Sequence, residues 1–261
     1  MPNSINVLAL FAHPDDAEFL CAGTLAHLAA RGATIHMATL TAGDCGSTTL
    51  PAAKISAVRQ KEAAKSAALI GATYHCLRSK DLLVFYDGPH LNKVMELVRE
   101  TCPVLVLTHS PVDYMADHET VSQLCQSACF GAMAPNFRTG AKRPAPPLQG
   151  VPHLYYADAF GRRDILGNRI ASGLSVNISG TLKLKEEMLA CHDSQQAWLK
   201  TQQEIPETVT TMRKMAHEAG RRAGFRWAEG FRQHLGQGFP ATNLLRELLG
   251  PLVRESKIGQ K

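Results

Sequence analysis

The alternation of apolar runs with helical patterns is the feature that most restricts how this chain can fold. Residues 7–12 form a continuous apolar run, which is typical of a strand buried on both faces of a parallel sheet. A helical pattern follows over residues 20–31 and ends at Gly32, and residues 34–40 are predicted to form a second strand. A strand, a helix and a strand in this order predict a right-handed parallel crossover.

The same alternation continues along most of the 261 residues. Further helices are predicted over residues 51–70, 91–100, 117–130, 181–191 and 207–235, with a short amphipathic segment at 243–249. Further strands are predicted over residues 73–77, 82–85, 104–108, 153–157 and 174–178. Strands that alternate with helices indicate an α/β fold class, so we expect a Rossmann-like parallel sheet with helices on both faces.

We expect one domain over residues 1–261, because this length suits a single large domain and the chain contains no internal repeat. Residues 131–152 are rich in proline and glycine and are predicted to form a long loop. Long loops in compact domains are often functional, so this loop is expected at the active site. Residues 181–261 are expected to form a C-terminal helical extension.

Composition limits the partners and the location of the protein. The 28 Lys and Arg residues exceed the 23 Asp and Glu residues only slightly and are scattered, so we expect no nucleic-acid partner. No apolar run approaches the roughly 18 residues of a membrane helix, so we expect no membrane partner. Seven cysteines without a CxxC pair, and no leader peptide, predict a cytoplasmic protein. Assembly into a homo-oligomer is left open.

The turn after the first strand concentrates ionisable side chains. Residues 12–18 read Ala-His-Pro-Asp-Asp-Ala-Glu, without the glycines of a phosphate-binding turn. Ligands of open α/β sheets bind at the carboxyl ends of strands, where this turn is expected. Clustered carboxylates repel one another, and a divalent cation offsets that repulsion. His and Asp are usual zinc ligands; the alternative is a polar turn in which Asp15 or Asp16 caps the next helix.

A second polar segment, residues 109–119, follows the strand predicted over residues 104–108. Because neighbouring strand ends converge in a parallel sheet, His118 can meet His13 and Asp16 in space. Two His and one Asp with open positions make a catalytic metal site rather than a closed structural one. Asp117 is predicted either to orient a ligand or to cap the following helix.

Two further residues are candidates for contact with a substrate. Asp44 follows the second strand in a loop between Gly43 and Gly46, where glycines allow close approach to a ligand. A plain turn explains Asp44 equally well. Tyr114 is a candidate to donate a hydrogen bond to an oxyanion, and simple packing is its alternative.

These motifs resemble the PIG-L/LmbE-like deacetylases, zinc-dependent enzymes that remove acetyl groups from N-acetylglucosamine-type amino sugars, with relatives that cleave other amides. The similarity rests on Ala-His-Pro-Asp-Asp at 12–16, Arg59-x-x-Glu62, the Asp-His pair at 117–118 and residues 191–195. The resemblance implies an LmbE-like domain that covers most of the chain.

The resemblance also implies roles for individual residues. His13, Asp16 and His118 would bind the metal. Asp15 would be the general base, and Arg59 would contact the substrate or support the site. The chain departs from the family at Met115, which stands where a histidine stabilises or protonates the reacting group, and at Ala17, where the family often has Glu.

The expected function is therefore metal-dependent hydrolysis of an amide, as N-deacetylation of an amino sugar or a related small N-acyl substrate. Zn²⁺ is the expected cofactor, although Fe²⁺ or another divalent cation also suits these ligands. An amidase that acts on another N-acyl or thiol conjugate is an alternative. A non-haem iron oxygenase uses two His and one carboxylate but normally on an all-β barrel. An inactive metal-binding protein is the remaining alternative, because Met115 cannot ionise.

Overall fold

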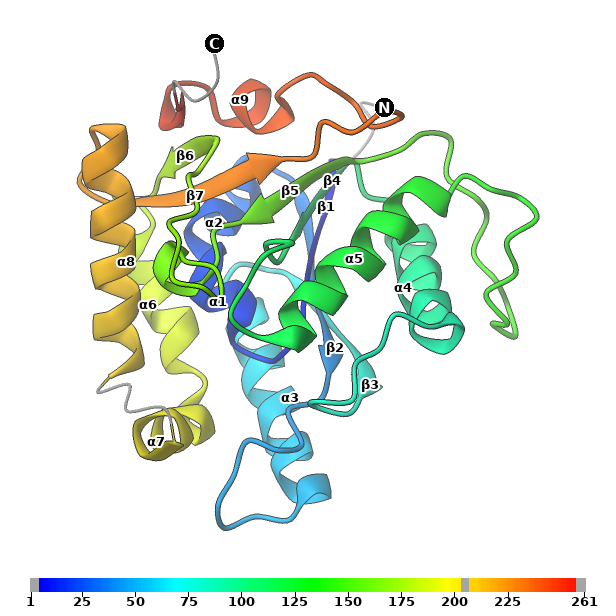
Figure 1. The fold of residues 1–261 in the computed structure, drawn as a ribbon, viewed down its shortest axis with the longest axis horizontal. Coiled ribbons are helices and arrows are strands. Elements are labelled where there is room, and N and C mark those ends of the chain that lie inside the picture. Colours follow the sequence, from blue (N-terminus) through cyan, green and yellow to red (C-terminus); the bar gives the residue numbers. More distant parts are fainter. Residues whose placement is uncertain (1–4, 203–206, 257–261) are drawn as a thin grey trace.

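An eight-stranded sheet runs through the centre of the molecule in the computed structural model, which describes residues 5–202 and 207–256 (Figure 1). The strands are β1 (Asn6–Phe11), β2 (Thr34–Thr41), β3 (Thr73–Ser79), β4 (Leu105–Thr108), β5 (His153–Ala157), β6 (Leu174–Asn177), β7 (Ala228–Gln233) and β8 (Val253–Glu255). Their order across the sheet is β3-β2-β1-β4-β5-β7-β6-β8. The strands from β3 to β5 in this order are parallel, whereas β7, β6 and β8 pair antiparallel to their neighbours.

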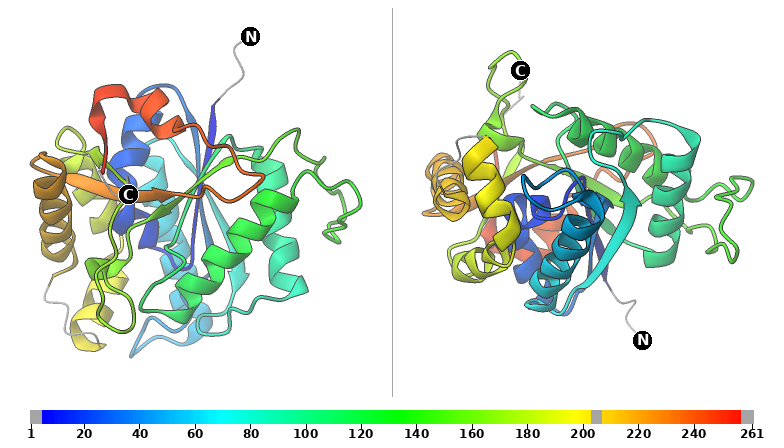
Figure 2. Two further views of the ribbon diagram at one scale, coloured as in Figure 1. Left: turned by 45° about the horizontal axis from the view of Figure 1, so that its top comes forward. Right: turned by 90° about the horizontal axis from the view of Figure 1, so that it is seen from below.

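Helices cover both faces of the sheet (Figures 1 and 2). They are α1 (Asp16–Leu20), α2 (Ala22–Ala29), α3 (Ala52–Ala68), α4 (Gly88–Thr101), α5 (Ala116–Gly131), α6 (Leu182–Ala190), α7 (Asp193–Gln202), α8 (Thr208–Ala223) and α9 (Leu244–Leu249), with single 3₁₀ turns η1 (Phe160–Arg162) and η2 (Gly250–Leu252). The predicted α/β fold class is confirmed, and the sheet is mixed rather than wholly parallel.

Alternate residues of β1 belong to two separate hydrophobic clusters, one on each face of the sheet. Val7, Ala9 and Phe11 pack in the cluster that contains side chains of α2, α6, α8 and α9. Leu8 and Leu10 pack in the cluster that contains side chains of α4 and α5. Burial on both faces explains why this strand is apolar without interruption. It also holds the turn after β1 in a fixed place at the sheet's carboxyl edge.

The C-terminal part of the chain corrects two predictions. The helix predicted over residues 207–235 ends at Ala223, because Gly224 adopts a left-handed conformation with φ 69° and closes α8. The chain then returns through the sheet as β7, between β5 and β6. Residues 181–256 therefore contribute two strands, β7 and β8, and do not form a purely helical extension.

Two smaller predictions also need correction. The helix predicted over residues 20–31 is shorter and corresponds to α2; the separate helix α1 precedes it, and the backbone leaves helical geometry between them at Cys21. Residues 82–85 form no strand, because Leu82 has a positive φ of 63° that breaks an extended conformation. Both corrections concern backbone next to the functional site.

The proline-rich loop of residues 131–152 packs beside α4 and projects from that side of the molecule (Figures 1 and 2). Arg99 of α4 donates hydrogen bonds to the carbonyl groups of Ala132, Ala134 and Phe137, which anchors the loop there. Its expected place at the active site is not what the structure shows, since no described residue of it lines the cavity described below.

Residues 1–4, on which the leader-peptide expectation depends, lie outside the described residues, as do both ends of the predicted 1–261 domain. Across residues 5–202 and 207–256, none of the helices combines the length and apolar character that a bilayer crossing requires.

Candidate metal centre

A cavity of about 250 Å³ opens at the carboxyl ends of β1 and β4. Its walls come from the turn after β1, the loops after β2 and β3, the start of α5, and the segments η1 and α7. The three expected metal ligands, the expected base and the candidates Arg59 and Tyr114 all line this cavity. The structure thus brings together residues that lie more than a hundred positions apart in the sequence.

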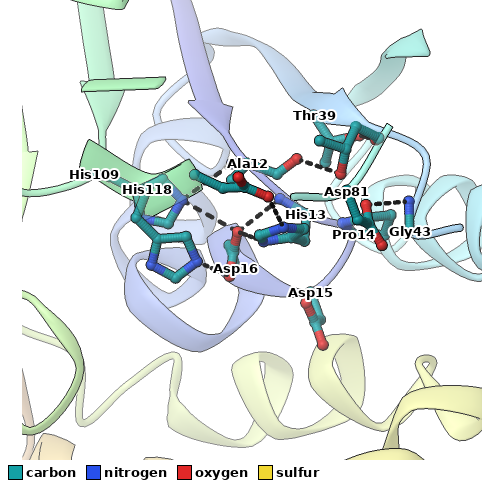
Figure 3. Close-up of polar contacts among 12 residues, drawn as sticks. Ala12, His13, Pro14, Asp15, Asp16, Thr39, Gly43, Asp81, His109 and His118 are labelled. Atoms are coloured by element: carbon teal, nitrogen blue, oxygen red, sulfur yellow. Dashed lines mark hydrogen bonds and ion pairs between the residues drawn. The ribbon is translucent and has the colours of Figure 1, made fainter. Parts of the chain in front are cut away.

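The three expected ligands lie side by side (Figure 3). Nδ1 of His13 lies 3.3 Å from Oδ2 of Asp16, and Nε2 of His118 lies 3.6 Å from Oδ1 of Asp16. One donor atom from each of the three residues falls within 4.8 Å of the others. Two imidazole nitrogens and one carboxylate form a donor set that suits a divalent cation such as Zn²⁺ or Fe²⁺. The residues present therefore fit the metal that the sequence predicts.

Both histidines are held by a second carboxylate. His13 donates from Nε2 to Asp117 Oδ2 at 3.1 Å, which leaves Nδ1 facing Asp16. His118 donates from Nδ1 to Asp113 Oδ1 at 2.9 Å, which leaves Nε2 facing Asp16. Such partners set the tautomer and orientation of metal-binding histidines. Of the two roles considered for Asp117, the structure supports the orienting one, because the described contacts of its side chain are with His13 and the Leu82 amide.

The electrostatics of the cluster follow from burial and charge pairing. Burial opposes a charge on His13, but hydrogen bonds to Asp117 and Asp16 raise its pKa to about 10. Burial also disfavours a charge on Asp16, yet His118 and His109 hold the pKa of that carboxyl well below its usual range. Asp16 is therefore ionised at neutral pH and available as a ligand. A cation at this cluster competes with the proton on His13.

Asp15 occupies the next position of the same turn but projects in a different direction (Figure 3). Its carboxylate lies 3.3 Å from Nη2 of Arg59, which also donates to the carbonyl oxygen of Pro14 at 2.5 Å. Burial raises the pKa of Asp15 to about 6, although the nearby Arg59 charge acts in the opposite direction. A carboxyl with such a pKa accepts a proton near neutral pH, as a general base must.

Two other groups of potential ligands fit a cation less well. His109, Asp113 and His118 form one group, but His109 is fully buried and does not line the cavity. Asp44, Cys45 and Asp81 form the other. There the Asp81 carboxylate accepts from the amides of Gly43 and Cys45, and Asp44 accepts from the amide of Asp81. These carboxylates already have backbone partners, so they shape the loop.

The substrate candidates differ in their positions. Tyr114 is about half exposed, with an exposed fraction of 47%, and packs edge-on against His118 at 5.4 Å. Arg59 lines the cavity while its contacts hold the turn at Pro14 and Asp15. Asp44 is not among the described residues that line the cavity. Their contacts with a substrate stay predictions, and so does the consequence of Met115, which lines the cavity.

Several residues near the site were given no metal-binding or catalytic role from the sequence. His109 stacks on His118 at 3.9 Å, and its Nε2 lies 3.1 Å from Asp16. Asp113 orients His118, and Phe160 and Trp198 add aromatic wall to the cavity. His109 and Asp113 lie in the segment that follows β4, and this position at the end of a strand could have indicated from the sequence that they are near the site. Phe160 and Trp198 arrive through long-range packing, which local sequence does not reveal.

The fold and site together define an α/β domain with a candidate metal centre. Residues 8–129 match the family described as PIG-L: GlcNAc-PI de-N-acetylase. The matched segment contains all three expected ligands. The sheet is also unlike the all-β barrel on which iron oxygenases with a similar donor set normally sit.

Known proteins similar to this chain include both deacetylases and hydratases. It is 27% identical to 4-oxalmesaconate hydratase of Pseudomonas putida over 158 residues, which are 58% of this chain and 59% of that relative's length. The solved N,N'-diacetylchitobiose deacetylase of Pyrococcus horikoshii superposes with a TM-score of 0.74 at 23% identity, over 93% of this chain and 89% of that one.

A third similar protein is GalB, the 4-carboxy-2-hydroxymuconate hydratase of Pseudomonas putida KT2440. Its solved structure superposes with a TM-score of 0.72 at 21% identity, over 92% of this chain and 100% of that one. At such identities the two structural likenesses concern the fold alone.

Proposed function

We propose that this protein hydrolyses the amide bond of a small N-acylated amine, with N-acetylated amino sugars as the first candidates. The observation that carries the proposal is the position of Asp15. Its carboxylate lines the same cavity as the candidate metal ligands, and burial raises its pKa to about 6. A base in the same cavity as a two-His, one-Asp cluster is an arrangement that suits metal-dependent amide hydrolysis.

His13, Asp16 and His118 would hold the divalent cation, for which Zn²⁺ is the first candidate. A divalent cation there supplies Lewis acidity, which makes hydroxide available near neutral pH and stabilises negative charge on an acyl oxygen. Asp113 and Asp117 keep the two imidazoles turned toward Asp16. The site therefore needs little rearrangement of these side chains on binding.

Asp15 performs the proton transfers in this proposal. Its carboxylate removes a proton from the attacking water, and the resulting carboxylic acid delivers that proton to the leaving amine. Arg59 holds the turn and the Asp15 side chain in place through its two contacts. Met115 has no ionisable group, so it cannot supply the second proton-transfer residue that the family histidine provides.

Tyr114 and the apolar wall complete the expected binding surface. The ring of Tyr114 borders His118, and its hydroxyl is the candidate donor to the substrate's acyl oxygen. Phe19, Phe160 and Trp198 give the cavity an aromatic side. Aromatic faces pack well against the apolar face of a sugar ring or an acyl group, so this wall suits a neutral N-acyl substrate.

Hydration of an unsaturated carboxylic acid is the second candidate function, and the 27% identical hydratase favours it. A substrate with several carboxylates needs cationic side chains in its binding site. Arg59 is the sole Lys or Arg among the described residues that line the cavity, and it already contacts Asp15. This charge distribution supports amide hydrolysis over hydration.

The test is a comparison of three substrate classes with the full protein: N-acetylglucosamine, an N-acyl thiol conjugate and an unsaturated dicarboxylic acid. We expect release of free amine from an N-acyl compound, its loss with a chelator and its return with Zn²⁺. Asp15→Asn should lower the rate by about 10²–10⁴-fold, as loss of a general base does. Glu100→Gln, an exposed carboxylate outside the cavity, is the control. Hydration of the acid without amine release would establish the second candidate instead.

A further inference from the structure

Two arginines and three serines line a second cavity, of about 150 Å³, on the part of the sheet formed by its antiparallel strands. The polar lining comes from η1, from the loop that leads into β6, from β6 itself, from the last turn of α8 and from the residue after β8. These residues are Arg162, Ser172, Ser175, Arg222 and Ser256. Among the described residues, none lines both this cavity and that of the candidate metal centre.

Arg162 reaches this cavity with its hydrogen-bonding capacity largely unused. Its exposed fraction is 9%, and its Nε lies 3.2 Å from Oδ2 of Asp158, outside hydrogen-bond geometry. The same carboxylate oxygen accepts a hydrogen bond from Ser172 at 2.5 Å. Within residues 5–202 and 207–256, the Arg162 guanidinium donates no hydrogen bond. Of the Arg162 side-chain nitrogens only Nε is buried without a hydrogen-bond partner, so the two Nη groups stay accessible to an acceptor in the cavity.

Arg222 places a second positive charge at the same cavity. The charge of Arg162 lowers the pKa of Arg222, and Arg169 and Arg221 act in the same direction, while Glu218 opposes them. Arg222 forms no ion pair with any described residue. Like charges gathered in this way repel one another, and a bound anion removes that repulsion.

Arginines at the end of a helix are common, so their presence there does not by itself indicate a binding site. Arginines in the last turn of α8 complement the helix dipole. However, Arg162 belongs to η1, so the dipole of α8 does not account for it. The carbonyl groups of Ala223 and Gly224 at this helix end are bound instead by Nη1 of Arg254, at 2.7 and 3.2 Å. Arg222 is therefore not used to bind these carbonyl groups, and its side chain lines the cavity.

The hydroxyl groups of the lining match an oxygen-rich anion. Ser175 is nearly buried, with an exposed fraction of 5%, and its hydroxyl makes no hydrogen bond with the part of the chain that is described. Ser256 closes the cavity where its amide binds the carbonyl of Gly173 at 2.8 Å. The cavity of about 150 Å³ is several times the roughly 30 Å³ that one water occupies, so a small anion fits in it.

We propose that this cavity binds a small tetrahedral oxyanion, as phosphate or as the phosphate group of a larger ligand. Arg162 and Arg222 supply the charge, and the hydroxyls of Ser175 and Ser256 supply hydrogen bonds. Arginine forks match phosphate oxygens in pairs, and the two arginines that line this cavity come from different elements.

Calorimetric titration of the full protein at constant ionic strength tests the proposal, with inorganic phosphate and phenyl phosphate as probes. We expect saturable binding of one equivalent. Arg222→Gln and Ser175→Ala should each weaken it, the arginine variant by about tenfold or more. Arg221→Gln removes the neighbouring exposed charge without touching the cavity, so its affinity should stay within about twofold. Arg222 is exposed, so loss of folding does not explain the result.

The two probes separate the possible sources of the anion. Equal or tighter binding of phenyl phosphate assigns the site to the phosphate end of a larger ligand, and binding of inorganic phosphate alone assigns it to the free ion. Thermal unfolding gives an independent readout, because a ligand raises the midpoint only of proteins that bind it. Absence of saturable binding by both probes would overturn the proposal, and so would binding unchanged in Arg222→Gln and Ser175→Ala.

Discussion

At the scale of single residues, two adjacent aspartates in one turn have opposite environments. Asp15 adopts a left-handed backbone conformation with φ 111°, which is strained for a residue with a side chain. This conformation separates its carboxylate from that of Asp16 (Figure 3). Burial raises the pKa of Asp15 to about 6, whereas His118 and His109 outweigh burial and lower the pKa of Asp16. The turn therefore provides one carboxylate for a proton and one for a cation.

The separate roles of these aspartates give the first prediction. Asp16→Asn should lose the metal, because a ligand is removed, and His118→Ala should lose it for the same reason. Asp15→Asn should keep the metal and lose turnover, because the base lies outside the ligand set. Elemental analysis and turnover of each purified variant are the measurements. Loss of metal in Asp15→Asn would show that the two roles are reversed.

Met115 gives the second prediction. Because the pKa of Asp15 is raised to about 6, its basic form predominates above that pH, and kcat/KM should fall as the pH drops below about 6. Met115→His introduces a second titrating group at the cavity wall and should change the basic side of the profile. The measurement is kcat/KM against pH for both proteins on one amide substrate. Superimposable profiles would place position 115 outside the chemistry.

At the scale of elements, the loop after β2 depends on a glycine for its close approach to Arg59. Gly43 has φ 72°, and a Cβ there would lie 2.5 Å from Nη1 of Arg59. Arg59 is buried, with an exposed fraction of 3%, and packs between this loop and the turn at Asp15. The loop therefore sets the position of the arginine that contacts the expected base.

Replacement of this glycine is the third prediction. Gly43→Ala should lower both the thermal midpoint and kcat, because backbone strain of roughly 1–2 kcal/mol is joined by displacement of Arg59. Gly32→Ala is the matched control, since Gly32 has φ 85° but open space around its Cβ position. The control should lose stability and keep full kcat. Equal kcat in the two variants would show that Arg59 adapts without consequence for the site.

The sequence predicts the elements of the first half well and those of the second half less well. Continuous apolar runs identify β1 and β4, because both strands are buried on both faces. The segment Ala228–Gln233 reads Ala-Glu-Gly-Phe-Arg-Gln, and its polar residues hide a strand that pairs with β5 and β6. Gly230 is needed there, because a Cβ would meet Asp158 Oδ2 at 2.1 Å. Contacts with residues distant in the sequence determine this strand, and they produce no periodic pattern of apolar residues within it.

The convergence of the three expected ligands was predictable for the same physical reason that makes the fold predictable. His13, Asp16 and His118 follow two buried strands, and parallel strand ends converge. The orienting role of Asp113 depends on the local path of the chain between β4 and α5, which periodicity does not describe. The expected position of residues 131–152 failed because length alone does not tell which side of a domain a loop occupies.

At the scale of the whole molecule, an ion pair joins the first helix to the C-terminal half. Nε2 of His192, between α6 and α7, lies 3.1 Å from Oε1 of Glu18 in α1, and both side chains are buried. Burial disfavours both charges, but each residue offsets that cost for the other. The Glu18 charge raises the pKa of His192 above 6.5, and His192 lowers the pKa of Glu18 below 4.5.

This pair gives the fourth prediction, which concerns stability against pH. The raised pKa of His192 contributes stability that is present below about 6.5 and is lost as pH rises through the folded value. The lowered pKa of Glu18 contributes stability that is present above about 4.5 and is lost as pH falls through its folded value. Thermal midpoints of the wild type and Glu18→Gln should therefore differ most between these values. A difference that is constant up to pH 9 would contradict this assignment.

The carboxylate partners of His13 and His118 have a further consequence, which concerns how a metal ion would bind and exchange at the site. Both partners belong to one short stretch, Asp113 just before α5 and Asp117 in its first turn, so a single piece of chain orients the two imidazoles. Because these side chains are oriented before an ion binds, binding and release of an ion would need little change in the structure of the site. In most proteins the affinities of such sites for divalent transition metals follow the same order from one metal to the next. If these residues bind a cation as proposed, the supply of each ion in the cell would then decide which metal they hold.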